Sequence, residues 1–295
     1  MSRRQSGPFI LQSLLHAEIF AGNNEHKNNF IFYAAIGLQI KLNQFPDLYS
    51  TMNRTLVIGD IHGGLRALVQ VLKKAGVSAS DQLIFLGDYV DGWSESAQVM
   101  EYVIGLGEKQ PCIFIKGNHD AWCEDWLRTG HADRNWLMHG GQATVRSYST
   151  VNNKTQLQHL DFFERMNLYH IDQQNRLFIH AGFTSMHGPQ KEFQSSNFSW
   201  DRTLWETALT MDKQISRGSV LFPKRLKLFE EIYIGHTPTV FYNETIPMNG
   251  ANVWNIDTGA AFTGRLTVMD VDTKDCWQSQ PVKDLYPGEM GRNSD

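Results

Sequence analysis

Cysteine, excess charge and long apolar runs are all scarce in this sequence of 295 residues. Its three cysteines, Cys112, Cys123 and Cys276, cannot all pair and form no C-x-x-C motif. This pattern argues against a disulfide framework and a zinc–thiolate site, and it is typical of reduced thiols in a cytoplasmic protein. The net charge of -4 gives no basic excess of the kind that nucleic-acid-binding domains carry. Because no apolar run approaches the roughly 20 residues that cross a bilayer, we expect cytoplasmic localisation, with neither nucleic acid nor membrane as a partner.

The first 51 residues differ in pattern from the rest of the chain. Polar residues interrupt the apolar stretch that follows the basic residues near the start, so we do not interpret this segment as a signal peptide. We interpret residues 1–51 as an N-terminal extension outside the core, with Met52 as the natural start of a folded domain over residues 52–280. The polar residues 281–295 are expected to form a flexible tail. Deletion of the extension should then leave activity and Tm nearly unchanged.

Five short apolar segments each end in a residue type that can bind a metal ion or move a proton. Apolar runs of this length between turn residues predict buried strands. Asp60 and His62 lie two positions apart after the first run, so an extended backbone aims both side chains the same way. In open α/β sheets, ligands bind at the carboxyl ends of the strands. The five segments are Thr55–His62, Gln82–Asp91, Pro111–Asp120, Arg176–Gly182 and Glu231–Pro238.

Helical and strand patterns alternate along the first half of the chain. Residues 64–75 and 94–106 carry apolar side chains at helical spacing and separate the first three apolar segments. Strand, helix and strand in succession favour a parallel or mixed sheet with right-handed crossovers. Residues 252–256, 265–271 and the stretch around Trp277 alternate like antiparallel strands. This order predicts the α/β fold class.

The polar ends of the five segments form a set of motifs, namely Gly59-Asp60-Ile61-His62, Gly87-Asp88-Tyr89-Val90-Asp91, Gly117-Asn118-His119-Asp120, His180-Ala181-Gly182 and Gly235-His236-Thr237. In this order they resemble the motifs of the calcineurin-like metallophosphoesterases, and most of all the bacterial and phage branch of the serine/threonine phosphoprotein phosphatases. The resemblance implies a four-layer α-β-β-α sandwich of two mixed sheets with flanking helices. It also implies cap-like helical segments at about residues 120–165 and 183–228. We interpret the tryptophans of the first segment as packing residues rather than as platforms for the substrate.

The resemblance also implies a site for two divalent metal ions that share Asp88 as a bridge. One ion would be held by Asp60, His62 and Asp88, and the other by Asp88, Asn118, His180 and His236. Imidazole, carboxylate and amide donors without thiolate favour Mn²⁺, Fe or Zn²⁺ over copper. We expect Mn²⁺, with Fe or Zn²⁺ as the alternatives.

A mechanism follows from the same resemblance. A metal-bridging hydroxide would attack phosphorus directly, without a covalent enzyme intermediate. His119 follows the ligand Asn118 and would protonate the leaving oxygen as the general acid. Asp91 would accept a hydrogen bond from His119 and keep its ring oriented and protonated. The alternative for His119 is a surface residue at the start of a helix.

Departures from the family pattern bear on substrate binding. The phosphoprotein-phosphatase pattern continues Gly-Asp-x-Val-Asp with Arg-Gly, whereas this chain has Gly92 and Trp93 there. Loss of that arginine removes one bidentate phosphate anchor, which should raise KM and weaken selection for monoesters. Arg202 is a candidate for the other arginine of the site, the alternative being an exposed helical cation, and Asn118 is a candidate substrate contact as well as a ligand. His139 stands where the bacterial pattern Trp-x-x-Asn-Gly-Gly has asparagine.

These inferences predict a metal-dependent phosphoric ester hydrolase that acts on phosphomonoesters, as a serine/threonine phosphatase does on a phosphorylated protein. Relatives with Gly-His-Thr motifs cleave dinucleoside polyphosphates. A bis(5′-nucleosyl)-tetraphosphatase, or a broad phosphodiesterase acting on small phosphoesters, is therefore the alternative. A possibility from another class is a metal-binding scaffold without catalysis, and the intact pair of Asp91 and His119 argues against it.

Overall fold

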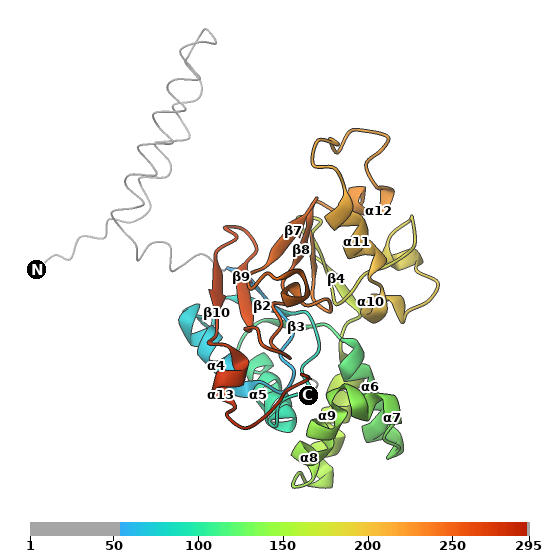
Figure 1. Ribbon diagram of the computed structural model, residues 1–295. Helices are drawn as coiled ribbons and strands as arrows, with labels where there is room; N and C mark the ends of the chain where they lie inside the picture. Colours follow the sequence, from blue (N-terminus) through green and yellow to red (C-terminus); the bar gives the residue numbers. More distant parts are fainter. Residues whose placement is uncertain (1–53, 294–295) are drawn as a thin grey trace, which may run out of the picture. The chain divides into compact units, whose positions relative to one another are not determined.

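Two mixed five-stranded sheets form the centre of the computed structural model, which describes residues 54–293 (Figure 1). The strand order is β10-β9-β1-β2-β3 in the first sheet and β4-β5-β6-β8-β7 in the second. The predictions made for residues 1–51, and for Met52 as the start of the domain, lie outside the described residues. The strands are β1 Thr55–Ile58, β2 Gln82–Phe85, β3 Cys112–Phe114, β4 Tyr169–Ile171, β5 Leu177–Ile179, β6 Ile232–Ile234, β7 Met248–Gly250, β8 Val253–Asn255, β9 Thr267–Asp270 and β10 Cys276–Gln278.

The first three strands are parallel, and a helix connects each strand to the next. α4 (Leu65–Lys74) lies between β1 and β2, and α5 (Ser96–Gly107) lies between β2 and β3, so both expected helices are confirmed. Side chains alternate in direction along a strand. Leu56 and Ile58 of β1 consequently pack in the cluster that includes these helices, whereas Val57 between them packs in a different cluster. Because the strands are parallel, their carboxyl ends lie at the same edge of the sheet.

The second sheet repeats this arrangement on the other side of a shared core. β5, β6 and β8 are parallel, and β4 and β7 pair with them antiparallel at the two edges. The outer residues of β5 and β6 pack with the short helices α11 (Thr203–Thr210) and α12 (Lys224–Lys227). Their central residues, Phe178 and Tyr233, pack with Val57 of the first sheet. The four-layer α-β-β-α sandwich is therefore confirmed.

The strands of the final third follow the sequence prediction in part. β9 pairs antiparallel with β1 and with β10, as the alternating pattern predicted. β8 differs, because it pairs antiparallel with β7 but parallel with β6. A strand takes its direction from its connections. The hairpin to β7 and the longer crossover from β6 therefore give β8 one neighbour of each kind.

Two groups of helices follow β3 and β5 along the chain. The first group, green in Figure 1, spans residues 118–165, and the second, yellow to orange, consists of short helices within residues 183–228. The remaining helices of the described part are α6 Asn118–Thr129, α7 Arg134–Trp136, the π-helical turn η2 Leu137–Gly141, α8 Gln142–Tyr148, α9 Asn153–Arg165, η3 Pro189–Lys191, α10 Asn197–Trp200, η4 Thr239–Tyr242 and α13 Val282–Leu285.

Cross-links and membrane-crossing helices are absent from residues 54–293. Cys112, Cys123 and Cys276 are all free thiols. No described helix combines the length and the apolar character that a membrane crossing requires.

The C-terminal segment corrects the prediction of a flexible tail. Val282 and Tyr286 are 0% and 1% exposed, and the ring of Tyr286 stacks on Trp93 with 5.3 Å between centroids. The backbone N–H of Arg292 donates to the carbonyl oxygen of Ala261 at 2.8 Å. The two buried side chains are four positions apart, but one helical turn among polar residues is too short a pattern to predict that this segment packs. Residues 282–292 form a strap across the domain.

Candidate metal centre and active site

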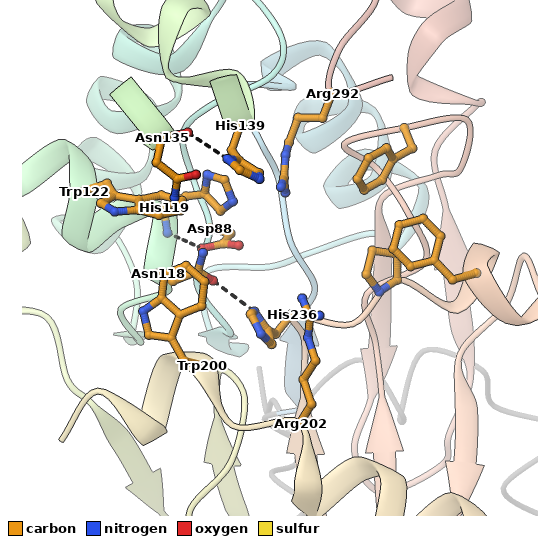
Figure 2. Close-up of a pocket in the computed structure, with 13 residues that line it drawn as sticks. Asp88, Asn118, His119, Trp122, Asn135, His139, Trp200, Arg202, His236 and Arg292 are labelled. Atoms are coloured by element: carbon orange, nitrogen blue, oxygen red, sulfur yellow. Dashed lines mark hydrogen bonds between the residues drawn. The ribbon is translucent and has the colours of Figure 1, made fainter. Parts of the chain in front are cut away.

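Eight polar side chains from the ends of β1, β2, β3, β5 and β6 meet in one buried cluster. Each is 8% exposed or less, although carboxylates and imidazoles are costly to bury without a partner. Part of the cluster lines a cavity of about 220 Å³ (Figure 2). The sequence predicted every member of the cluster, which consists of Asp60, His62, Asp88, Asp91, Asn118, His119, His180 and His236.

Glycines within the motifs let the loops approach one another closely. A Cβ atom at Gly117 would lie 2.1 Å from Oδ1 of Asp88, and one at Gly235 would lie 2.1 Å from Oδ1 of Asp60. Neither contact is possible for any other residue type. The two glycines are therefore required by the carboxylates of neighbouring strands.

Four members of the cluster have strained backbones. His62, Asp88, Asp91 and His236 have φ angles of 53°, 54°, 74° and 69°. Residues other than glycine rarely adopt positive φ, and such strain gathers at functional sites. The strain turns each side chain into the cluster just after its strand has ended.

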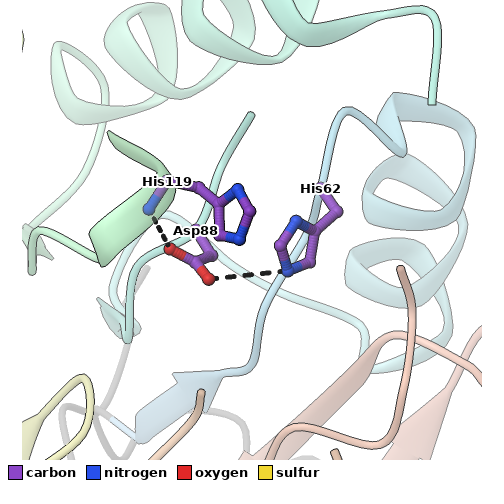
Figure 3. Close-up of side chains that lie close together, drawn as sticks. All are labelled: His62, Asp88 and His119. Atoms are coloured by element: carbon purple, nitrogen blue, oxygen red, sulfur yellow. Dashed lines mark hydrogen bonds and ion pairs between the residues drawn. The ribbon is translucent and has the colours of Figure 1, made fainter. Parts of the chain in front are cut away.

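The first group of donor atoms surrounds Oδ2 of Asp88. Nε2 of His62 lies 3.5 Å from this oxygen (Figure 3). The same nitrogen lies 3.9 Å from Oδ2 of Asp60. Nδ1–H of His62 donates to the carbonyl oxygen of Val90 at 3.1 Å. Because a carbonyl oxygen only accepts, the lone pair of the ring is on Nε2, which faces the carboxylates as a metal ligand would.

The second group shares the same oxygen of Asp88. Nε2 of His180 lies 3.4 Å from it, and Nδ1–H of His180 donates to the carbonyl oxygen of Leu86 at 2.8 Å. Oδ1 of Asn118 lies 3.2 Å from Nε2 of His180 and 2.9 Å from Nδ1 of His236. Nε2 of His236 is buried and has no hydrogen-bond partner among the described residues. These donors converge on one point from three different loops.

The donor set fits a pair of metal ions. Nε2 of His180 and Oδ1 of Asn118 both present lone pairs, and two facing acceptors are unfavourable unless a proton or a cation lies between them. The donor atoms of His62, Asp88 and His119 lie within 4.8 Å of one another, and so do those of Asp88, His180 and His236. Asp88 is common to both groups, and its Oδ2 faces an imidazole of each. Nitrogen and oxygen donors without thiolate suit the metals expected from the sequence.

Burial and neighbouring charges raise the pKa of some groups in the cluster and lower the pKa of others. Burial raises the pKa of Asp60 well above its usual range, with the charge of Asp257 adding to the effect. Burial lowers the pKa of His62 and of His236. For His180, the carboxylate of Asp88 overcomes burial and raises the pKa to about 10. A proton on His180 thus balances Asp88 in the protein alone, and a metal ion would replace that proton.

His119 and Asp91 form a hydrogen-bonded pair beside this cluster. Nδ1–H of His119 donates to Oδ2 of Asp91 at 2.6 Å, and both side chains are 2% exposed or less. The backbone N–H of His119 also donates to Oδ1 of Asp88 at 3.0 Å (Figure 3). With Nδ1 engaged, Nε2 is the ring atom that can exchange a proton with a bound molecule. His119 lies in the cavity wall rather than at the surface.

Two further residues donate hydrogen bonds to Asp91, and the sequence did not predict a role at the site for either. The indole N–H of Trp136 donates to Oδ2 of Asp91 at 2.7 Å, and the hydroxyl of Thr144 donates to Oδ1 at 2.6 Å. Together with His119, they give the buried carboxylate three side-chain donors. The interpretation of Trp136 as a packing residue is therefore incomplete. The Trp-x-x-x-Gly-Gly-x-x-Thr spacing was the available signal.

Asp120 is a third residue whose role the sequence did not reveal. It is fully buried, and its carboxylate accepts the backbone N–H groups of Asp88, Tyr89 and Gly117 at 2.7, 2.9 and 2.8 Å. Burial, with the charge of Asp88 adding to it, raises its pKa to about 7. Asp120 ties the loop after β2 to the loop after β3, and so sets the distance between the candidate ligands Asp88 and Asn118.

The cavity in front of the cluster has aromatic and cationic walls. Trp122 lies edge-to-face with Trp200 at 5.0 Å between centroids, and Phe241 lies 5.3 Å from Phe262. The tryptophans of residues 120–165 thus divide, since Trp122 lines the cavity whereas Trp136 is buried. The wall also includes the predicted Arg202, together with Asn135, His139 and Arg292.

The chain is similar to curated enzymes of one name. It is 28% identical over 236 residues to the bis(5′-nucleosyl)-tetraphosphatase PrpE of Oceanobacillus iheyensis, and the alignment covers 74% of this chain and 89% of that protein. It is 29% identical over 229 residues to the enzyme of the same name from Anoxybacillus flavithermus, with 72% and 88% covered.

Solved structures and a family model agree on the fold. A putative diadenosine tetraphosphatase gives a TM-score of 0.54 at 16% identity, over 77% of this chain and 93% of that chain. A serine/threonine phosphatase from Saccharomyces cerevisiae gives 0.53 at 14% identity, over 77% and 80%. The model of the calcineurin-like phosphoesterase family matches residues 53–257, well over half of the sequence. The chain therefore belongs to the calcineurin-like phosphoesterase family, and it is a metallophosphoesterase.

Proposed function

We propose that this protein is a dinuclear phosphohydrolase that cleaves its substrate by direct attack on phosphorus, with His119 as the general acid. The observation that carries the proposal is that one cavity is lined both by Asp88, Asn118 and His236 of the cluster and by His119, whose ring is hydrogen-bonded to Asp91 behind it. Asp60, His62 and Asp88 would hold one cation, and Asp88, Asn118, His180 and His236 the other. When bound, two divalent cations supply a water molecule of lowered pKa as the nucleophile and polarise the phosphoryl oxygens.

The protein residues then have to bring about the departure of the leaving group. A bond forms between phosphorus and the water oxygen, and the bond from phosphorus to the leaving oxygen breaks. The leaving oxygen takes the proton from Nε2 of His119, whose positive charge is stabilised by Asp91 at 2.6 Å from Nδ1. Three donors hold Asp91 in place, so the imidazole needs no reorganisation during the step.

For the substrate we propose a dinucleoside polyphosphate, cleaved asymmetrically. The curated relatives carry this activity in their name. The aromatic pairs of the cavity wall support it, since Trp200 and Phe241 are 43% and 64% exposed and offer flat surfaces on which a nucleobase can stack. Two arginines in the same wall suit a chain of several phosphates.

A phosphoserine or phosphothreonine protein is the second candidate substrate. The motif order favours it, and the Trp136 and Thr144 of the protein-phosphatase pattern both contact Asp91. An open aromatic rim would also accept a peptide. The two candidates differ in what must bind beside the phosphate.

A substrate panel tests the proposal and separates the candidates. Diadenosine tetraphosphate, a phosphoserine peptide and p-nitrophenyl phosphate are compared with Mn²⁺, Fe²⁺ or Zn²⁺ added to metal-free protein. We expect the highest kcat/KM with Mn²⁺ and diadenosine tetraphosphate, with ATP and AMP as products. Preference for the phosphopeptide would favour the second candidate, and no turnover of any substrate with any metal would contradict both.

A Trp200→Ala variant tests whether the aromatic wall of the cavity binds a nucleobase. We expect KM for diadenosine tetraphosphate to rise about 10-fold, in keeping with the loss of one stacking contact, while KM for p-nitrophenyl phosphate stays unchanged. Phe193→Ala is the matched control, because Phe193 is fully exposed and does not line the cavity. An equal effect on both substrates would argue against base stacking.

A further inference from the structure

The C-terminal strap is fastened to the stretch that directly follows Asp91. Tyr286 stacks on Trp93, and the carboxylate of Glu289 accepts hydrogen bonds from the backbone N–H and the hydroxyl of Ser94 at 3.0 and 2.8 Å. A Cβ atom at Gly291 would lie 2.7 Å from the ring of Trp93, so only glycine fits there. Three successive contacts thus fix the position of the next residue, Arg292.

The side chain of Arg292 runs through a groove formed by two glycines. Hydrogen-bonded loops bring Gly92 and Gly140 together, with the N–H of Gly92 donating to the oxygen of Gly140 at 3.3 Å. Cβ atoms at these two positions would lie 3.2 and 3.1 Å from Cγ of Arg292. Both glycines have φ near 107°. Glycine suits position 92 on both counts, and the aliphatic part of the Arg292 side chain occupies the space where a side chain at position 92 would lie.

The guanidinium of Arg292 lines the cavity, and one of its donors is left unpaired by the described residues. Its Nε is buried and has no hydrogen-bond partner among residues 54–293, while the aromatic ring of Phe262 lies 5.3 Å from the guanidinium carbon. Arg292 shares the cavity wall with Asp88, Asn118 and His236. Figure 2 shows Arg292 and Arg202 entering the cavity from opposite sides. A buried donor without a partner, beside a metal-ligand cluster, indicates a site for an anion.

We propose that Arg292 is the phosphate anchor of this enzyme, supplied by the C-terminal strap to the space beside Gly92. The inference rests on the proposed function, because the bound group is the phosphoryl group of the substrate. It adds a residue outside the family match, which ends at residue 257. Arg292 is a substrate-binding residue, whereas Tyr286, Glu289 and Gly291 are positioning residues that act through it.

Phosphate binding by the Mn²⁺-loaded full chain tests the proposal without turnover. The Kd of inorganic phosphate is measured by titration calorimetry for wild type, Arg292→Gln, Arg292→Lys and the control Lys283→Gln. Lys283 is exposed on α13 of the same strap and does not line the cavity, so its variant removes the same charge from the same segment. Metal content and Tm are recorded for each protein.

We expect Arg292→Gln to weaken phosphate binding about 10- to 100-fold, as loss of charged hydrogen bonds does. Arg292→Lys should fall between this variant and wild type, because lysine keeps the charge but not the planar fork. Lys283→Gln should match wild type. A chain that ends at Gly291 removes the guanidinium without a substitution and should reproduce Arg292→Gln, which protects the comparison against a folding defect of one variant.

Two results would overturn the proposal. One is a phosphate Kd for Arg292→Gln within about twofold of wild type, and the other is an equal loss in Lys283→Gln, since either shows that the guanidinium itself is not the anchor. Failure of the proposed function looks different. In that case the wild type binds phosphate through Arg292 but turns over none of the three substrates, and the anchor stands without the reaction.

Discussion

The two sheets supply the candidate site with two differently built halves. On the side of the first sheet, Asp91 accepts three side-chain donors and Asp120 accepts three backbone N–H groups. On the side of the second sheet, Nε2 of His236 has no partner among the described residues, and Arg202 from the adjoining segment is exposed in the cavity wall. Asp91 and Asp120 on the first side are thus already hydrogen-bonded, whereas Nε2 of His236 on the second side is left unpaired by the described residues.

This difference suggests that the first half serves proton transfer and the second half serves binding. A group that transfers a proton has to be held in place before the reaction, and each hydrogen bond to Asp91 would serve that purpose for His119 in its proposed role. A group that binds metal or phosphate, by contrast, stays unpaired until the metal ion or the substrate is bound. We therefore expect changes in the first half to reduce kcat, and changes on the substrate side to raise KM or a binding constant.

Asp88 faces residues of both halves, so its substitution should have the largest effect and should impair metal binding and catalysis together. Asp88→Asn removes the charge of the one oxygen that faces both His62 and His180. We expect activity to fall below detection and the bound metal to be lost, measured by elemental analysis of the purified protein. Retention of two metal ions by this variant would show that Asp88 is not the bridge.

His119→Asn isolates the proton-transfer half. We expect metal content to stay at the wild-type level and kcat for a phosphoserine peptide to fall by about 100- to 10,000-fold, the usual contribution of a general acid. p-Nitrophenyl phosphate, whose leaving group needs less protonation, should be affected far less. Equal losses on both substrates would indicate that His119 does not act as the acid.

Thr144→Val tests whether the support of Asp91 matters. The variant keeps the shape of the side chain but removes the donor that lies 2.6 Å from Oδ1 of Asp91. We expect kcat to drop about 10-fold with KM nearly unchanged, as for other residues that orient a catalytic group. Ser149→Ala, which removes an exposed hydroxyl bonded to the backbone of Arg146, is the control. A rise in KM alone would contradict the division proposed here.

The smallest effect is expected in the loop that follows β5, where one carboxylate organises the backbone. Glu192 accepts N–H groups of Thr184 and Ser185, which overcome slight burial and lower its pKa to about 2. Because the folded-state pKa is lowered, this stabilisation is present above the usual pKa of glutamate and is lost as the pH falls toward 2. Glu192→Gln should lower Tm by about 1–3 °C at pH 7 and by less at pH 3.5.

Glu206→Gln is the control for this measurement, since Glu206 is an exposed acid on nearby α11. Its Tm should follow wild type at both pH values. A Tm difference for Glu192→Gln that does not shrink on acidification would mean that the charge of Glu192 is not what holds the loop.

The sequence predicted which side chains gather around Asp88 far better than it predicted the surroundings of the cluster. Asp60, His62 and Asp88 stand beside apolar runs that mark their own strands, so a local pattern revealed them. Trp136 and Thr144 contact Asp91 from 45 and 53 positions away. Their spacing marks the two residues as a motif, but it does not reveal which distant residue they contact. The prediction of a flexible C-terminal tail is wrong for the same reason. Tyr286 of the strap packs on Trp93, which lies nearly 200 positions earlier in the chain.

The sequence by itself determined the strands other than β4 and β7, the two crossover helices and the residue types that gather at the candidate site, since apolar periodicity and motif order can be read along the chain. The tertiary structure decided which carboxylate each imidazole faces, which donors hold Asp91, and where an arginine enters the cavity. The physical reason is that hydrogen bonds and close glycine contacts join atoms brought together by the packing of the two sheets. Their geometry exists only once β1, β2, β5 and β6 lie around a common core.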